Sequence, residues 1–225
     1  SLEIDPNNSL ARHGYADYLV TQGRLDESVE QVLLGRKSNP LSPIANAVVV
    51  GHLYIARRYG EVVAEARRLL AIDPKYPGAG VFLREAYWQL GELEESIEML
   101  RETAWGRDPQ FPEAMDRGYA EGGPRGVMLA LAELLEAKSR SEHVDPQTIA
   151  LHYAWGGRSD SAMEWMEKAA EGRSPLFIHT LLDPAFDSIR DTPRFKELRL
   201  RLNLPEGAWA SEGELPDGDI IRLRE

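Results

Sequence analysis

An evenly spaced Asx-Pro dipeptide is the feature that most constrains how this chain can fold. Four such dipeptides end similar amphipathic stretches, and they lie 34, 34 and 35 residues apart: Asp5-Pro6, Asn39-Pro40, Asp73-Pro74 and Asp108-Pro109. A fixed period of this length is typical of repeat proteins, in which each repeat packs mainly against its neighbours. The chain is therefore expected to form an array of similar units.

Each repeat is predicted to consist of a helix, a turn and a second helix. Turn signals lie in the middle of the intervals, at residues 22–27, 56–61 and 90–95, and apolar residues three and four apart follow each turn. In the third repeat these apolar residues are Leu93, Ile97 and Leu100. That spacing places them on one face of a helix, which we expect to face the neighbouring helices.

Small residues twelve positions apart mark where the two helices of a repeat should approach each other. Ala16 with Ser28 and Ala150 with Ala162 fit this pattern. Arg84 stands at the corresponding position of the third repeat and departs from it.

These residues resemble the tetratricopeptide repeat family, whose 34-residue unit carries a small residue on each helix and a closing proline. The pattern is carried by three sets of residues, in the first, third and fifth repeats: Tyr15, Ala16, Leu19, Ser28, Val32 and Pro40; Leu83, Tyr87, Ser96, Leu100 and Pro109; and Ile149, Ala150, Tyr153, Ala162, Met166 and Ala169. The resemblance implies an all-α fold, a right-handed α-solenoid of helix hairpins. We expect an array over residues 1–173, with a partial repeat at 1–7 and about five repeats after it.

The ends and the fourth repeat depart from this regularity. Gly122-Gly123-Pro124 is expected to break a helix of the fourth repeat. The first residues match the end of a repeat, so we expect the natural protein to continue upstream. Capping residues followed by proline, at Ser174-Pro175, Asp183-Pro184 and Thr192-Pro193, predict three short helices in a C-terminal cap over residues 174–204. Residues 205–225 are expected to form an acidic tail.

Composition disfavours several classes of partner. The chain has a net charge of −11 and no cysteine, so thiolate metal sites and disulfides are excluded, and phosphate backbones and anionic lipids are repelled. The longest mostly apolar stretch, residues 44–56, is shorter than the roughly 20 residues that cross a bilayer. We therefore expect neither nucleic acid binding nor membrane insertion.

The inner, concave surface of such an array is the expected binding site. First helices line it, and the candidate groove residues are His13, Asp17, Thr21, Gly51, Tyr54, Ile55, Val81, Glu85, Trp88 and Gln89. The Lys and Asn residues with which some family members bind a peptide carboxylate are absent from these positions. We expect a hydrophobic or basic protein segment as partner, with Tyr54 and Trp88 as anchors.

One part of this inner surface looks covered. The stretch from Pro43 to Ala56 is apolar almost all round. Three candidates could cover its inner face: neighbouring repeats, the chain's own tail through Trp209 and Ile220-Ile221, or a second copy of the protein.

No set of residues predicts catalysis, a metal or a cofactor. The five histidines show no two-histidine metal motif, although His13 and Asp17 are four apart on one expected helix. The acidic residues Glu92, Glu94, Glu95, Glu98 and Glu102 alternate with apolar residues, as on a solvated helix face. We therefore expect that the protein is not an enzyme.

A second resemblance concerns function. The segment from Ala150 to Pro205 is similar to the closing region of bacterial signalling proteins whose repeats follow a winged-helix DNA-binding domain, a nucleotide cyclase or a protein kinase. It implies a protein–protein interaction scaffold, the regulatory or sensor module of a larger bacterial signalling or transcription protein. A helical-repeat RNA-binding module is the alternative. The expected location is the cytoplasm, or the periplasm if a membrane span lies upstream.

Overall fold

The computed structural model describes residues 8–102, 108–172 and 177–202, and all regular structure in these ranges is helical. In chain order the elements are α1 (Ser9–Thr21), α2 (Leu25–Arg36), α3 (Pro43–Ile55), α4 (Tyr59–Ile72), α5 (Pro77–Leu90), α6 (Leu93–Glu102), α7 (Gln110–Lys138), α8 (Pro146–Trp155), α9 (Ser159–Glu171), α10 (Phe177–Leu182), the 3-10 helix η2 (Pro184–Ile189) and α11 (Pro193–Arg201).

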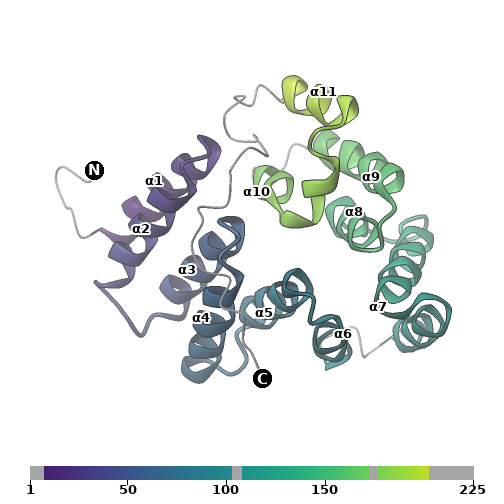
Figure 1. Ribbon diagram of the computed structural model, residues 1–225, viewed down its shortest axis with the longest axis horizontal. Coiled ribbons are helices and arrows are strands. Elements are labelled where there is room, and N and C mark those ends of the chain that lie inside the picture. The colour runs from purple at the N-terminus through teal and green to yellow at the C-terminus, as the bar shows by residue number, and fades with distance from the viewer. Residues whose placement is uncertain (1–7, 103–107, 173–176, 203–225) are drawn as a thin grey trace.

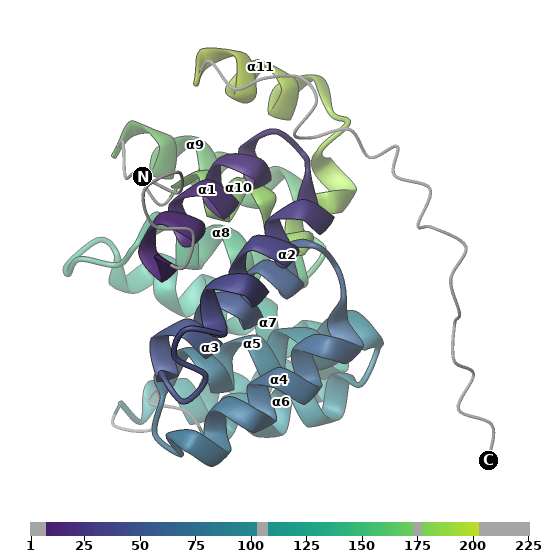
Figure 2. The ribbon, with the colours of Figure 1, turned by 90° about the vertical axis from the view of Figure 1, so that its left-hand side faces the viewer.

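Consecutive helices from α1 to α9 pack against each other and follow an arc (Figure 1). Helices α3, α5 and α8 lie on the inner side of this arc, and α4, α6 and α9 lie on its outer side. Viewed from the side, the pairs step from α1 and α2 to α5 and α6 (Figure 2). None of the helices in the described ranges is long and apolar enough to cross a membrane.

The 34-residue period is present in the helix boundaries. The first helices of three successive pairs begin at Ser9, Pro43 and Pro77, each 34 residues after the one before. The second helices, α2, α4 and α6, keep the same interval. The predicted units of helix, turn and helix are confirmed for these three pairs.

Local sequence explains where several helices begin. The side chains of Asn8, Ser42 and Asp145 each accept a hydrogen bond from a backbone N–H in the first turn of the following helix. Proline occupies the first turn of α3, α5 and α8, where a missing N–H costs nothing because that group has no partner within the helix.

The small residues lie at the helix contacts, as predicted. Ala16, Ala150 and Ala162 are fully buried, and Ser28 is 1% exposed. Ser28 contacts His52 of the next pair. A larger side chain at these buried positions would push neighbouring helices apart.

The predicted break at Gly122–Pro124 is also present. Within α7 the backbone is non-helical at Gly122 and Gly123, and Gly123 has a φ of 60°, a conformation that glycine adopts without strain. On either side of the break Gly118 and Gly126 approach so closely that a Cβ atom on Gly118 would lie 2.4 Å from the Gly126 carbonyl oxygen. The two halves of α7 therefore form a tight hairpin in place of a regular pair.

This close approach predicts that replacing glycine by alanine changes the free energy of unfolding in opposite directions at two positions. We expect Gly118→Ala to lower the free energy of unfolding by about 1–3 kcal/mol, because the new methyl group meets backbone that cannot rotate away. Gly14→Ala, in the middle of α1 with open space around it, is expected to raise the free energy by up to about 1 kcal/mol through helix propensity. Urea denaturation measures both, and equal effects would contradict the close packing.

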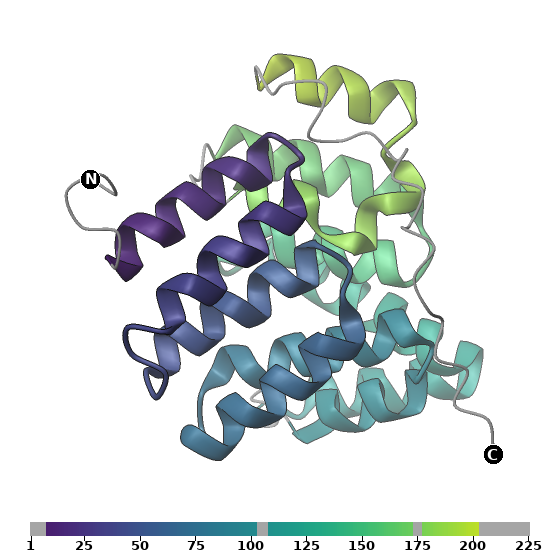
Figure 3. The same cartoon turned by 60° about the vertical axis from the view of Figure 1, so that its left-hand side comes forward.

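The C-terminal helices do more than cap the last pair. Asp183 and Thr192 accept the predicted capping hydrogen bonds, whereas Ser174-Pro175 lies outside the described residues. Helix α11 packs on α9, with Phe195 and Leu198 buried and Arg194 paired with Glu167. Helices α10 and η2, however, lie inside the arc between α3 and α8 (Figures 1 and 3).

Three covers are expected for the apolar inner face of residues 43–56: neighbouring repeats, the tail at residues 205–225, or a second copy of the protein. Inside the arc it is the segment 177–189 that fills part of the concave face, and the tail lies outside the described residues. Val20 of α1 and Ile55 of α3 belong to the same buried apolar cluster as Leu181 and Phe186. The two ends of the array thus share one core. The rest of the buried apolar face of α3, including Val50 and Leu53, lies in a second cluster with residues of α1, α2, α4 and α5, so neighbouring repeats cover most of this helix.

Candidate functional site

A cavity of about 400 Å³ remains on the concave face beside the C-terminal segment. Its walls come from α1, α3, α5, α8, α10 and the start of η2, and its lining is mainly apolar: His13, Asp17, Ile44, Ala47, Val48, Gly51, His52, Tyr54, Ile55, Tyr76, Phe82, Leu151, Thr180 and Asp183. Ile44, at the start of α3, is 69% exposed and lies at the rim.

The structure brings together one half of the predicted groove residues. The cavity is lined by His13, Asp17, Gly51, Tyr54 and Ile55. Gly51 is the equivalent, in the second repeat, of Asp17 in the first and Glu85 in the third. Because glycine has no side chain, this position leaves space in the cavity.

The other half lies away from the cavity. Thr21 donates its hydroxyl hydrogen bond to the carbonyl oxygen of Tyr18, and Val81 is exposed elsewhere on α5. Glu85, Trp88 and Gln89 do not line the cavity either.

Tyr54 was expected to be an anchor open to a partner, and that expectation needs correction. Its side chain is 2% exposed, because the rings of Tyr59 and Phe82 pack against it at 5.9 and 5.7 Å between centroids. Its hydroxyl donates a hydrogen bond of 3.3 Å to Oδ1 of Asp183. Tyr54 therefore joins α3 to the C-terminal segment, and only its edge faces the cavity.

Glu85 is buried, and Trp88 is partly buried against the core. Trp88 packs against Trp155 of α8 at 6.2 Å between ring centroids. Glu85 is 6% exposed and accepts a hydrogen bond of 3.0 Å from Arg84, whose guanidinium lies 5.2 Å from the centre of the Trp155 ring. The arginine that departs from the small-residue pattern is thus explained, because it pairs α5 with α8 across the arc.

An ion-pair network fastens the C-terminal segment to the end of α3. Asp187 accepts two hydrogen bonds from Arg57, at 3.1 and 2.6 Å, and a third from Arg190. Arg190 is buried and also donates to the carbonyl oxygens of Leu181 and Asp183. The pair of Arg57 with Asp187 is bidentate, and Arg190 makes further hydrogen bonds to Asp187 and to the backbone. The network therefore stabilises the contact more than an isolated surface ion pair would.

Arg57 adopts a backbone conformation that usually calls for glycine. Its φ is 61°, and the equivalent turn positions 34 residues to either side are Gly23 and Gly91, also with positive φ. A side chain in this region costs on the order of 1–2 kcal/mol. The strain is offset by the pair with Asp187, which only a long cationic side chain at this turn can make.

The ion pair and the strain can be separated by a double-mutant cycle. We expect Asp187→Asn to destabilise the wild-type protein more than it destabilises the Arg57→Gly variant, with a coupling energy of about 1 kcal/mol. Glu61→Gln, which removes an exposed pair with Arg58 at one helix end, serves as control and should cost little. Urea denaturation gives the four free energies, and a coupling near zero would show that the pair does not hold the segment.

Burial shifts the ionisation of two acidic groups beside the network. It raises the pKa of Glu85 to about 8, against the effect of Arg84 and with a contribution from Asp183. It likewise raises the pKa of Asp183 to about 6, against the hydrogen bonds from Ala185 and Tyr54. Both carboxyl groups are therefore easier to bury when protonated.

This gives a pH dependence of stability. A carboxyl group whose pKa is higher in the folded chain contributes stability that is complete below its unfolded value, 4.5 for Glu85, and lost as pH rises through about 8. We expect the free energy of unfolding of the wild type, relative to Glu85→Gln, to fall between about pH 4.5 and 8. Urea denaturation across this range tests it, with Glu98→Gln at an exposed position as control. Parallel curves for wild type and Glu85→Gln would contradict the assignment.

A cluster of two histidines and a carboxylate lies at the rim of the cavity. Nε2 of His13 is 3.6 Å from Oδ2 of Asp17, and Nε2 of His52 is 3.4 Å from Oδ1 of Asp17. The expected proximity of His13 and Asp17 is confirmed. His52 is a partner that linear spacing could not reveal, because it comes from the next inner helix.

Ser28 contacts the other nitrogen of His52, with 2.6 Å between Oγ and Nδ1. The serine is 1% exposed and does not line the cavity. A group in the cavity cannot reach its hydroxyl, so the set Ser28, His52 and Asp17 lacks the accessible nucleophile of a hydrolase triad.

The remaining histidines do not join this cluster. His143 is exposed, and burial lowers the pKa of His152 to about 4, so that its ring is neutral. The side chain of His179 lies outside the described residues.

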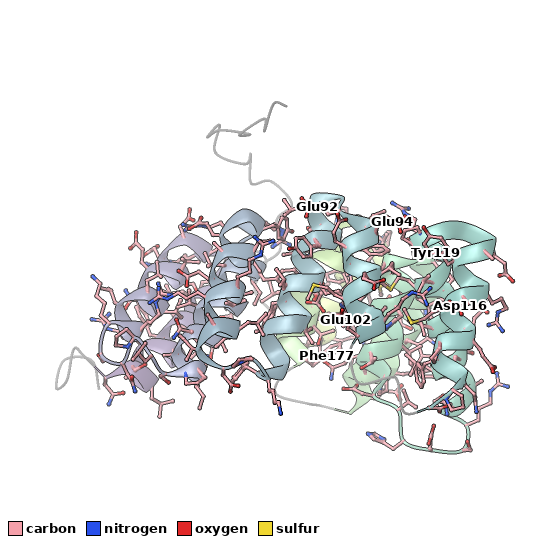
Figure 4. The ribbon with its side chains drawn as sticks, turned by 90° about the horizontal axis from the view of Figure 1, so that it is seen from below. Glu92, Glu94, Glu102, Asp116, Tyr119 and Phe177 are labelled. Atoms are coloured by element: carbon pink, nitrogen blue, oxygen red, sulfur yellow. The ribbon has the colours of Figure 1, made fainter. Side chains whose placement is uncertain are left out.

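The acidic residues of α6 form a solvated face, as predicted. Glu92, Glu94, Glu95, Glu98 and Glu102 are all exposed. Figure 4 shows Glu94 of α6 and Tyr119 of α7 lying near each other, and the tyrosine hydroxyl donates a hydrogen bond of 2.9 Å to Oε2 of Glu94. This face links neighbouring helices and is not part of the cavity.

Comparison with protein-family models and with curated proteins found no match to this chain.

Proposed function

We propose that this chain is a protein–protein interaction scaffold, a right-handed α-solenoid of tetratricopeptide type that acts as the regulatory or sensor module of a larger bacterial signalling or transcription protein. The 34-residue interval between helix starts supports the repeat type. The observation that carries the binding role is the apolar cavity on the concave face, with carboxylates at its rim and inner wall.

The partner is a basic segment of another protein that inserts one apolar side chain into the cavity. A volume of about 400 Å³ lies near the lower end of the roughly 300–1,000 Å³ typical of ligand pockets, which suits one anchoring side chain better than a long peptide. Asp17 at the rim and the net charge of −11 favour flanking Lys or Arg residues. Because residues 177–189 fill part of the concave face, the segment enters the cavity beside the exposed Ile44 and Asp17.

Selection from a random peptide library tests this proposal. We expect the enriched peptides to combine Lys or Arg with an aromatic or aliphatic residue. Ala47→Trp, which fills the cavity from its wall, should weaken binding of a selected peptide at least tenfold, whereas Ala64→Trp at an exposed position on α4 should not. Fluorescence anisotropy of the labelled peptide measures both.

Two results would contradict the proposal. The first is a selection that enriches no peptide. The second is a set of enriched peptides that bind Ala47→Trp as tightly as the wild-type protein, since they would then occupy another surface.

A further inference from the structure

We propose that His13, Asp17 and His52 form a binding site for one divalent transition metal ion of the zinc class. This inference goes beyond the interaction role and does not rest on it, because it follows from the arrangement of the three side chains alone.

The spacing of the ligand atoms fits a tetrahedral ion. Zinc binds imidazole nitrogen and carboxylate oxygen at about 2.0–2.1 Å, so the ligand atoms around it lie about 3.3 Å apart. Nε2 of His52 is 3.4 Å from Oδ1 of Asp17 and Nε2 of His13 is 3.6 Å from Oδ2, so the two imidazoles approach different oxygens of one carboxylate. One ligand atom from each of the three residues lies within 4.8 Å of the others, and rotation of the partly exposed His13 and Asp17 side chains brings both nitrogens and one oxygen to the tetrahedral spacing.

The helices explain why the three residues converge. His13 and Asp17 are four residues apart on α1, which places them on the same face one turn apart. His52 lies on α3, the next inner helix of the array, and its ring meets that of His13 edge-on at 5.8 Å between centroids.

Ser28 orients His52 for metal binding. When Nδ1–H of His52 donates its hydrogen bond to Oγ of Ser28, 2.6 Å away, the lone pair of Nε2 points to Asp17. Histidines that bind metal ions usually donate their other N–H to an oxygen in this way, which fixes both tautomer and ring orientation. Ser28 is therefore a positioning residue for the metal site.

The exposure of the three side chains and their chemistry indicate how an ion would reach the site and which ion would bind. The His52 ring is 5% exposed, whereas His13 and Asp17 are about one-third exposed, so an ion enters from the cavity side. Two imidazoles and one carboxylate select borderline ions such as Zn²⁺ and Co²⁺ over Mg²⁺ and Ca²⁺, which prefer oxygen ligands. Three protein ligands leave the fourth position facing the cavity, open to water.

Titration with Co²⁺ tests the proposal, because tetrahedral Co²⁺ absorbs strongly in the visible range and substitutes for Zn²⁺. We expect the full chain, freed of metal by a chelator, to bind one Co²⁺ with a tetrahedral absorption band, and Zn²⁺ to displace it. Isothermal titration calorimetry then gives the affinity for Zn²⁺ in each variant.

Four variants distinguish a built site from incidental binding by histidine. His13→Gln and Asp17→Asn should each lower the Zn²⁺ affinity at least tenfold, and Ser28→Ala should lower it about tenfold through loss of ring orientation. His143→Gln, which changes an exposed histidine elsewhere, should leave the affinity unchanged. Circular dichroism verifies that each variant is folded, and the two changes at half-exposed positions provide independent tests.

The proposal is overturned if the wild-type chain shows no tetrahedral Co²⁺ band, or if His13→Gln and Asp17→Asn bind Zn²⁺ as tightly as the wild type. A loss of affinity in His143→Gln as large as that in His13→Gln would also overturn it, because binding would then be a property of surface histidines in general.

Discussion

The attachment of the C-terminal segment to the end of α3 is the contact on which the rest of this structure depends. Arg57 and Asp187 are 130 residues apart in the chain, and Tyr54 and Asp183 are 129 apart. These two contacts hold α10 and η2 inside the arc and let the two ends of the array share one apolar cluster. In an open repeat array the helix pairs touch only their neighbours.

The same residues also shape the candidate site. Tyr54 and Asp183 line the cavity while they join its two walls, so the dimensions of the cavity depend on the attachment. Asp17 takes part in both proposals made for this cavity. A metal ion there would neutralise the carboxylate that attracts a basic peptide, and by linkage each ligand would then weaken the binding of the other by the same factor.

Buried charge is a further consequence of closing the arc. Arg84, Glu85 and Arg190 would be solvated on an open concave face, but here each is less than 10% exposed. Removing charges from water is costly unless they are paired. Arg84 and Glu85 pair with each other, and Arg190 pairs with Asp187 and with two backbone carbonyl oxygens. This interior therefore ties the stability of the protein to pH more closely than an apolar core would.

The repeat and its helices were predictable because they follow from local chemistry. The turn between the two helices of a pair, the capping residues Asp183 and Thr192, and the break at Gly122–Pro124 each depend on residues close together in the chain. Periodicity together with these local signals was therefore enough to locate them.

What the sequence reasoning missed depends on contacts between repeats. It does not show that Tyr54 is buried or that His52 lies beside Asp17, because linear spacing shows which residues share a helix and not which helices meet across the arc. One signal was present in the sequence. The turns at the equivalent repeat positions 23 and 91 contain glycine, whereas position 57 is an arginine, and this indicates that its side chain makes a specific contact.

The measurement that tests this account most directly is the distance between the end of α3 and η2 in solution. Because the chain contains no cysteine, spin labels can be attached specifically at Gly60→Cys and Ser188→Cys, both exposed positions close in sequence to Arg57 and Asp187. Double electron–electron resonance should give a single, narrow distribution at short distance. A broad distribution, or a second population at long distance, would mean that the C-terminal segment does not close the arc.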